Sequence, residues 1–314
     1  MPSIEAPTQQ SLWGGVAPAQ DWDPDATRGA LDELFSLSRQ YRTGKEFREL
    51  LTFIGRFRFY SPFNVSLLHA QMPGATYVAP AHRWLHKFTR RIRTGARPLV
   101  MLKPMGPVMF VYDVSDTEPL EGAPPLPPEV ERPFEVRQGY VGTELERTIS
   151  NGVRDGIEVA TRDAGSQSAG VIRIAEIGRS LSYQYRERPV VESVRVPLRY
   201  EVLLNAKHSR EAQYATLVHE LAHLYCGHLG TPDIKWWPDR HSLPHDVAEL
   251  EAESVCYLLC DRLGIDNPSD AYLSQYLKDD AETPAINLDW VMKAAGLIEK
   301  MGSQRFMPRR PQTS

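Results

Sequence analysis

Two histidines four residues apart constrain the fold of this chain more than any other feature. The run His219-Glu220-Leu221-Ala222-His223 places both imidazoles on one face only if the segment is helical. On such a face the two rings can bind a single metal ion. With 9 histidines in 314 residues, this type of pentapeptide would occur by chance in roughly 2 percent of chains. The surrounding sequence must therefore support a helix.

The flanking residues predict that helix. Residues 199–204 are typical of a strand, and Ser209 can then cap a helix whose first turn contains Glu211, near the positive end of the helix dipole. Apolar residues recur at helical spacing through the motif, and Gly227 suits the left-handed turn that follows a helix. The two histidines are therefore expected in the middle of a helix, on rigid backbone.

A metal held by this pair needs a further ligand. Catalytic zinc normally has three protein ligands and one position open to water, whose pKa it lowers to about 7. In H-E-x-x-H sites the intervening carboxylate takes a proton from that water as the water attacks a peptide carbonyl. The motif therefore predicts one Zn²⁺ ion, His219 and His223 as ligands, and Glu220 as the general base and then the proton donor to the leaving amine.

The third ligand is expected in residues 245–260, which are predicted to form a second helix with Ser242 or Asp246 as its N-cap. Three glutamates compete in this segment. The apolar positions at helical spacing mark the side that packs on the core, and they are Ala248, Ala252, Val255, Leu259 and Leu263.

Geometry separates the three glutamates by a small margin. At about 100° per residue, Glu249 lies roughly 70° from the middle of the apolar stripe, while Glu251 and Glu253 lie roughly 90° and 110° away. Glu251 also shares a side with Arg262, which predicts that it faces water. We therefore rank Glu249 first as the ligand and expect Glu253 to orient a ligating residue. The alternatives for Glu249 are a capping-box pair with Asp246 or a solvated acidic face.

Three other histidines and three cysteines could contribute to the site. His228 does not fit the pattern H-E-x-x-H-x-x-G-x-x-H, because Gly227 and His228 follow His219 by eight and nine residues where the pattern requires seven and ten. His228 is therefore expected in a loop near the site mouth. His241 and His245 are similar cases, and each is expected either to be solvated or to stabilise an oxyanion. The cysteines are expected to be buried reduced thiols, with a Cys ligand to the metal as the alternative: Cys226, Cys256 and Cys260.

The first third of the chain is strongly basic. Residues 36–104 contain 13 Lys or Arg against two Glu, a net charge of +11, whereas the whole chain carries −4 and the remainder therefore −15. Such a division of charge predicts a module that binds a polyanion. Aromatic residues lie between the basic ones, and each base that stacks on an aromatic ring would contribute about 1–3 kcal/mol of binding free energy. The candidate nucleic-acid-binding residues are Arg56, Arg58, Arg83, Trp84, Lys87, Arg90, Arg91, Arg93 and Arg97. The alternative is that Phe53, Phe57 and Trp84 are core residues beneath a basic surface.

The pattern of the whole chain predicts an α+β protein of two domains. Six prolines between Glu118 and Pro133 indicate an extended linker. The predicted division is a disordered tail (1–25), a small basic α+β domain (26–118), the linker (119–133), a metallopeptidase domain (134–303) and a second tail (304–314). Strands are expected at 98–103, 108–114, 157–160, 170–174 and 195–204. Helices are expected around 31–37, 47–54, after Ser61, at 142–153 and at 288–301.

Composition narrows the cellular context. The chain has 42% hydrophobic and 24% charged residues, no apolar run near 18 residues and no secretory hydrophobic region. We therefore expect a cytoplasmic protein that makes no membrane contact.

The metal-binding half resembles a known family. Leu217-Val218-His219-Glu220-Leu221-Ala222-His223, preceded by a strand ending in Asn205 and followed by residues 249–253, resembles the ImmA/IrrE-type zinc metallopeptidases. In that resemblance two His and a later Glu hold zinc, and the later Glu opens an E-x-x-A pattern that maps onto Glu249. The resemblance implies a mixed α/β zincin-like fold from about residue 134.

The first half resembles the N-terminal domain of the ArdC-type antirestriction proteins. The similar stretches are residues 60–68, 73–76, Trp84, 92–102 and 110–117. The family often has Lys-Gly in the turn where this chain has Thr94-Gly95, which weakens the case for a phosphate contact there. The resemblance implies single-stranded DNA as a partner and protection of incoming DNA from restriction on a mobile element.

Three functions follow from these patterns. The first is a zinc-dependent metalloendopeptidase-like protein that binds single-stranded DNA, acts in antirestriction and has an unidentified protein substrate. The second is a regulatory metalloprotease that cleaves a DNA-bound repressor. The third is a non-catalytic DNA-binding protein with a structural metal.

Overall fold

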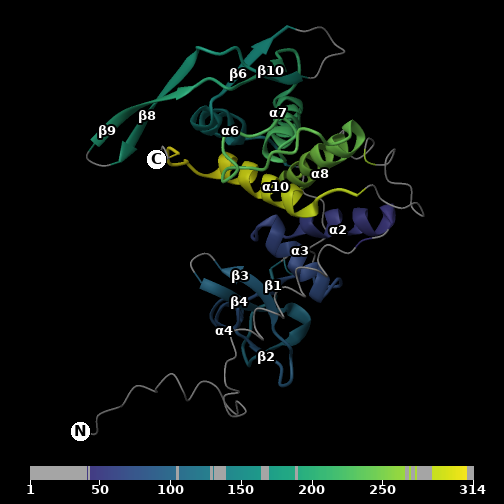
Figure 1. The fold of residues 1–314 in the computed structure, drawn as a ribbon. Helices are drawn as coiled ribbons and strands as arrows, with labels where there is room; N and C mark the ends of the chain where they lie inside the picture. The colour runs from purple at the N-terminus through teal and green to yellow at the C-terminus, as the bar shows by residue number, and fades with distance from the viewer. Residues whose placement is uncertain are drawn as a thin grey trace.

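The computed structural model describes residues 41, 43–103, 106–127, 130, 139–163, 170–187, 190–265, 269, 273 and 285–309. Its helices and several small sheets confirm the predicted α+β class. Small strands lie at one end, a layer of helices in the middle and a second group of strands at the other end (Figure 1). The predicted tail 1–25, the helical pattern at 31–37 and residues 310–314 fall outside the described part of the chain.

The first half begins with helices and continues with short strands. The helices are α2 (Gly44–Arg56), α3 (Pro62–Gln71) and α4 (Ala81–Phe88). The strands are β1 (Val78–Ala79), β2 (Arg90–Ile92), β3 (Leu99–Lys103), β4 (Gly106–Asp113) and β5 (Thr117–Pro119), with the short 3-10 turn η2 (Val114–Asp116) before β5. They form one sheet in the order β1-β4-β3 and a two-stranded pair β2-β5.

Helix α3 begins where the sequence predicted and closes the edge of a sheet. The Ser61 side chain caps it, and Pro62 occupies its first turn. Two turns apart on α3, Asn64 and Gln71 each exchange two hydrogen bonds with β3, at Leu102 and Val100 respectively, with lengths of 2.8–2.9 Å. The two amide side chains thus satisfy the backbone groups of an edge strand as a neighbouring strand would.

The second half places a small sheet and a long hairpin around the motif helix. Its helices are α6 (Glu144–Gly152), α7 (Arg210–Tyr225), α8 (His245–Leu263) and α10 (Leu288–Ser303), with the 3-10 turn η3 (Val153–Asp155) after α6. Its strands are β6 (Ile157–Arg162), β7 (Gly170–Ile174), β8 (Ser180–Glu187), β9 (Val190–Pro197) and β10 (Tyr200–Asn205). Strand β10 pairs parallel with β6 and antiparallel with β7, while β8 and β9 pair only with each other among the described strands. The predicted strand 195–204 is therefore the end of β9 and most of β10, divided at residues 198–199.

A single apolar cluster runs through both halves of the described chain. Buried residues of α2 and α3, such as Phe47 and Leu68, belong to the same cluster as Leu221 of α7, Leu258 of α8 and Ile298 of α10. A second, smaller cluster contains Ala79, Trp84, Phe88 and Val130. The helices of the basic half thus share a core with the motif helix, and the predicted boundary at residue 119 stays a prediction.

Arg262, near the end of α8, joins the halves by polar contacts. Its guanidinium donates to the carbonyl oxygens of Ile54, Phe57, Arg58 and Tyr60 over 2.7–3.2 Å, and its Nε donates to Glu299 over 2.6 Å. Arg262 is 3% exposed. The inference that the Arg262 side of α8 faces water is therefore wrong, because the carbonyls at and after the end of α2 need donors and lie against α8.

Both the predicted linker and the predicted C-terminal tail contact the rest of the chain. Val130 is buried against the cluster of Trp84. At the other end, Asn151 donates to the carbonyls of Met301 and Gln304, and Arg309 pairs with the buried Asp155. Residues 304–309 are therefore held against α6 and η3.

Among the described residues, no helix has both the length and the apolar character needed to cross a bilayer.

Candidate metal centre

The motif helix has the ends that the sequence predicted. The Ser209 side chain accepts from the backbone N–H of Ala212 at 3.2 Å and caps α7. After the helix, Gly227 has φ +89°, and a Cβ there would lie 2.3 Å from the carbonyl oxygen of Pro238. A glycine is required at this turn. His219, Glu220 and His223 thus lie on the second half of a regular helix.

Helices α7 and α8 lie side by side and bring the side chains of His219, His223 and Glu249 together in a triangle (Figure 1). The Nε2 atoms of His219 and His223 are 3.2 Å apart. Glu249 places one carboxylate oxygen 3.6 Å from Nε2 of His219 and the other 3.4 Å from Nε2 of His223. Zinc–ligand bonds of 2.0–2.2 Å at tetrahedral angles separate neighbouring ligand atoms by about 3.3–3.5 Å. The observed distances lie close to this range, so the three side chains form a group that could hold a metal ion.

Glu253 lies where the sequence predicted, beside a ligating histidine. Glu253 lies one turn after Glu249, and its carboxylate is 3.3 Å from Nδ1 of His219, on the ring edge opposite Nε2. A carboxylate in this place orients a ligating imidazole. His245 lies 3.6 Å from Glu249, and its side chain is 89% exposed.

Glu220 lies beside the triangle and contacts strand β7. Its Oε2 accepts from the backbone N–H of Ile172 at 2.9 Å. Burial raises the pKa of Glu220, with His219 and the Ile172 N–H opposing the shift and Glu249 adding to it. A raised pKa suits a carboxylate that must take up a proton.

His223 is the more enclosed of the two histidines of the motif. Burial, together with the neighbouring His219, His228 and His245, lowers the pKa of His223 to about 3. The imidazole is therefore neutral at pH 7, which is the form that binds a metal.

Glu251 is buried, and the prediction that it faces water is wrong. The residue is 0% exposed and accepts two hydrogen bonds of 2.7 Å from the guanidinium of Arg240. It also contacts His228 Nε2 at 2.9 Å and accepts from the backbone N–H of Asn287 at 2.7 Å. Burial alone would raise the pKa of Glu251, but these hydrogen bonds outweigh it and lower the pKa.

His228 and the start of α8 differ from the prediction, whereas His241 is solvated as one alternative expected. The side chain of His228 is 5% exposed, so His228 is enclosed rather than solvated. His241 is 71% exposed and pairs with Asp239 at 2.6 Å. Helix α8 begins after Pro244 with no side-chain cap, so the predicted N-caps Ser242 and Asp246 are wrong. The three cysteines are buried free thiols, as expected.

Seven of the nine candidate nucleic-acid residues lie around α4 and β2. Between Ala81 and Arg97 the sequence has six Lys or Arg and no acidic residue. Lys87, Arg91, Arg93 and Arg97 are exposed. Arg91 pairs with Glu118 at 2.5 Å, and Arg90 is held by the Thr117 side chain and carbonyl. Burial, and the nearby Arg93, lower the pKa of Arg90.

Trp84 belongs to the core of this region. The ring is 0% exposed, its N–H donates to the carbonyl of Tyr112 at 2.9 Å, and it packs against Tyr77 and Phe88. The indole therefore presents no face to a base, and the alternative that it is a core residue describes it. Phe53 and Phe57 are buried too, at 2% and 6% exposure.

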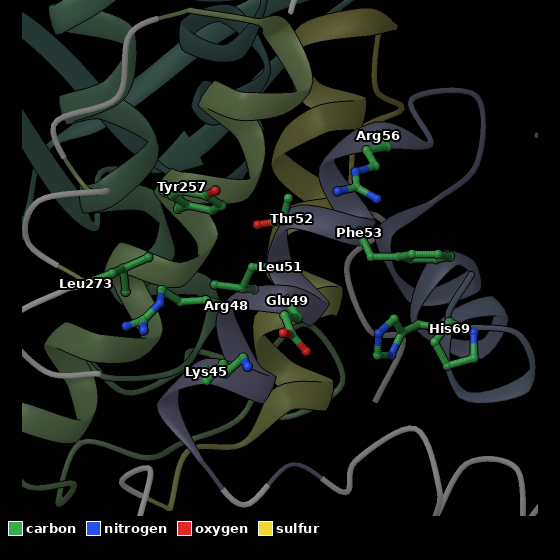
Figure 2. A pocket seen from close by; sticks show the side chains of 11 residues that line it. Lys45, Arg48, Glu49, Leu51, Thr52, Phe53, Arg56, His69, Tyr257 and Leu273 are labelled. Atoms are coloured by element: carbon green, nitrogen blue, oxygen red, sulfur yellow. The ribbon is translucent and has the colours of Figure 1, made fainter. Parts of the chain in front are cut away.

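The remaining two candidates, Arg56 and Arg58, lie apart from α4, at the end of α2. Arg58 donates to the carbonyl of Asp261 in α8. Arg56 lines a cavity of about 450 Å³ between α2, α3 and α8 (Figure 2). Lys45, Arg48 and Glu49 of α2 also line it, with His69 of α3 and Tyr257 of α8. This cavity is distinct from the metal triangle, whose residues do not line it.

Comparisons with known proteins leave the family open. No protein-family model and no curated protein matches the sequence. A crystal structure described as the metal-free antirestriction protein ArdC from plasmid R388 aligns with 79% of this chain and 85% of its own, at 16% identity and a TM-score of 0.34. A likeness of this degree assigns neither a family nor a function.

The sequence did not predict one buried polar group. Arg240 binds Glu251, and His228 lies between Glu251 and His223 of the motif. The available signal was the composition of α8, which has apolar residues on nearly every side, including Leu250, Val255 and Leu258. A helix of that kind is buried all round. Charged residues on it then require buried partners.

Proposed function

We propose that this chain is a zinc-dependent peptidase. The observation that supports it is the triangle of side chains His219, His223 and Glu249. Their two Nε2 atoms are 3.2 Å apart, and the two oxygens of Glu249 lie 3.6 Å from one of these atoms and 3.4 Å from the other. Two neutral imidazoles and one carboxylate are a donor set of catalytic zinc sites, in which a fourth position is left to water. His219, His223 and Glu249 would hold the ion.

Zinc, when bound, lowers the pKa of a coordinated water and polarises a carbonyl. The chain supplies the proton transfers. Glu220, whose pKa burial raises, takes the proton from the attacking water and delivers it to the departing amine. Its contact with the Ile172 N–H holds the carboxylate at the edge of the site.

Strand β7 offers a place for an extended peptide. It is an edge of the sheet β6-β10-β7 within the described residues, and it pairs with β10 on one side only. The Ile172 N–H points away from β10, toward Glu220. An extended peptide that pairs with this edge would lie beside the general base.

Metal analysis and peptide hydrolysis together test this proposal. Wild-type protein should bind one zinc and cleave members of a random peptide library, as read by mass spectrometry. Glu220→Ala should keep zinc and lose cleavage, and Glu249→Gln should lower zinc content. Glu176→Gln, an exposed carboxylate in the loop after β7, is the matched control and should change neither. Zinc-free wild type, or cleavage by Glu220→Ala at the wild-type rate, would refute the proposal.

We propose a second activity, binding of single-stranded DNA, at the basic surface around α4 and β2. The supporting observation is the set of exposed cations there, Lys87, Arg91, Arg93 and Arg97, in a stretch without acidic residues. Cations in such a cluster neutralise phosphates with little demand on base sequence. The sequence resemblance to ArdC-type proteins adds a physiological context, the protection of incoming DNA from restriction.

The DNA activity is tested with a fluorescent oligothymidylate by anisotropy. Affinity should fall with salt at a slope of about −0.7 per neutralised phosphate. The double variant Arg93→Ala/Arg97→Ala should reduce the slope by about 1.4. The matched control Lys293→Ala/Lys300→Ala removes two exposed cations of α10 and should leave it unchanged. No binding at low salt would refute the activity.

Comparing wild type with Glu220→Ala in a restriction-protection assay separates the roles. If protection survives in a variant that keeps zinc and DNA binding, the metal is structural and the effect is one of DNA binding alone. If protection is lost, hydrolysis is needed. A repressor cleaved in wild-type cells and intact in Glu220→Ala cells would instead favour the regulatory protease.

A further inference from the structure

A row of buried polar groups extends from His223 away from the metal triangle. Nδ1 of His223 lies 3.0 Å from Nδ1 of His228. Nε2 of His228 lies 2.9 Å from Oε2 of Glu251, whose carboxylate is bound by Arg240. The side chains of His228 and Glu251 are 5% and 0% exposed, so water does not substitute for these contacts.

The hydrogen bonds of Glu251 determine which ring nitrogen of His228 carries the proton. Oε1 accepts from Arg240 and from the Asn287 N–H, and Oε2 accepts from Arg240 and faces His228. A carboxylate has about four acceptor positions and, when ionised, no donor. Beside a guanidinium it is ionised. Nε2 of His228 must therefore be the donor in this contact.

The same reasoning extends one residue further, to His223. In a neutral His228 whose Nε2 carries the proton, Nδ1 is an acceptor. The atom facing it, Nδ1 of His223, must then donate. Nε2 of His223 is left with its lone pair, and this is the atom that faces Glu249 and His219. The row thus presents His223 in the tautomer that a metal requires.

The backbone of the loop after α7 folds back so that His228 lies against the end of the helix. The His228 N–H donates to the carbonyl of His223, and the Arg240 N–H donates to the carbonyl of Gly227, both at 2.9 Å. Arg240 also donates to the carbonyl of Cys226. The left-handed Gly227 permits this turn, so backbone and side chains agree in placing the row.

A second metal ion on these residues is the alternative. Cys226, His228 and Glu251 offer ligand atoms within 4.8 Å of one another. However, Arg240 and the Asn287 N–H already occupy the carboxylate, and a second cation would lie beside the guanidinium. Burial also raises the pKa of the Cys226 thiol, which disfavours the thiolate that binds metals. The charges therefore favour a hydrogen-bonded row.

We propose that His228 is a positioning residue for the metal centre: held by Glu251 and Arg240, it fixes the tautomer and ring orientation of His223. This inference rests on the proposed metal site. Partners of this kind change metal affinity by about 10–100-fold.

The test uses zinc competition against a chromophoric chelator. His228→Ala should still bind one zinc at saturation, with an affinity about 10–100-fold below wild type. His228→Asn, whose amide oxygen can accept from His223, should recover part of this loss. His82→Ala removes an exposed imidazole of α4, outside the metal centre, and should keep the wild-type affinity. Circular dichroism should show that all four proteins are folded.

A readout without metal separates the tautomer from general structure. In metal-free protein labelled with ¹⁵N-histidine, long-range ¹H–¹⁵N spectra should show Nδ1 of His223 protonated in wild type. His228→Ala should lose that preference. Wild-type zinc affinity in folded His228→Ala would overturn the inference while leaving the peptidase proposal intact. If wild type binds no zinc, or His219→Ala binds it as well as wild type, the metal site itself is refuted.

Discussion

Replacing Arg262 by Ala removes the polar connection between α8 and the end of α2. The guanidinium makes four hydrogen bonds to carbonyl oxygens and an ion pair with Glu299, and its side chain is 2% exposed. Breaking a buried pair costs about 3–5 kcal/mol, largely because the groups left behind lose their donors. Glu299 is 33% exposed and can regain water, which places the expected loss in unfolding free energy near the lower end, about 3–4 kcal/mol.

Thermal and urea denaturation measure this loss. At about 2 °C per kcal/mol for a long chain, the melting temperature should fall by about 6–8 °C. Arg262→Lys should lose less, because it keeps a charge and up to three of the donors. Arg97→Ala, an exposed arginine, is the control and should shift the melting temperature by less than about 1 °C. If Arg262→Ala matches that control, the contacts do not stabilise the fold. Two separated transitions would show that the halves unfold independently, against the shared core.

Three further predictions concern other parts of the molecule. Asn64→Ala and Gln71→Ala should each lower the unfolding free energy by about 1–3 kcal/mol. Amide hydrogen exchange should become faster at Leu102 in Asn64→Ala and at Val100 in Gln71→Ala. Faster exchange at Val100 in Asn64→Ala and at Leu102 in Gln71→Ala would contradict these contacts. Burial raises the pKa of Tyr60 to about 12, above its value in the unfolded chain. The stabilisation of the folded state by the neutral phenol is therefore fully present below about pH 10 and is lost as the pH rises toward 12. The unfolding free energy obtained from urea denaturation should therefore fall over that range, by about 2–3 kcal/mol in wild type and by less in Tyr60→Phe. Zinc at 100 times its dissociation constant should stabilise wild type by about 2.7 kcal/mol and His219→Ala by none, as calorimetry with and without a chelator would show.

Local patterns in the sequence were sufficient to locate the motif helix and its partner. Ser209, the apolar spacing and Gly227 gave the ends of α7, since a helix end is decided by a few neighbouring residues. Strand β7 and helix α10 were likewise found close to their observed ranges. Most of the hairpin β8–β9 was missed, although its sequence carries a strand signal: the half-buried Leu181, Tyr183 and Tyr185 alternate with exposed polar residues.

The sequence by itself determined which residues have the chemistry for a metal site: two histidines at helical spacing, and a glutamate chosen by its angle on a second helix. Only the tertiary structure decided how the charged residues of α8 are paired. Glu251 and Arg262 lie on buried faces because α2, α10 and the loop after α7 cover that helix, and their partners Arg240 and Glu299 come from other segments. Periodicity reports which faces of one helix are apolar, whereas the pairing of a buried charge depends on segments that only folding brings beside it.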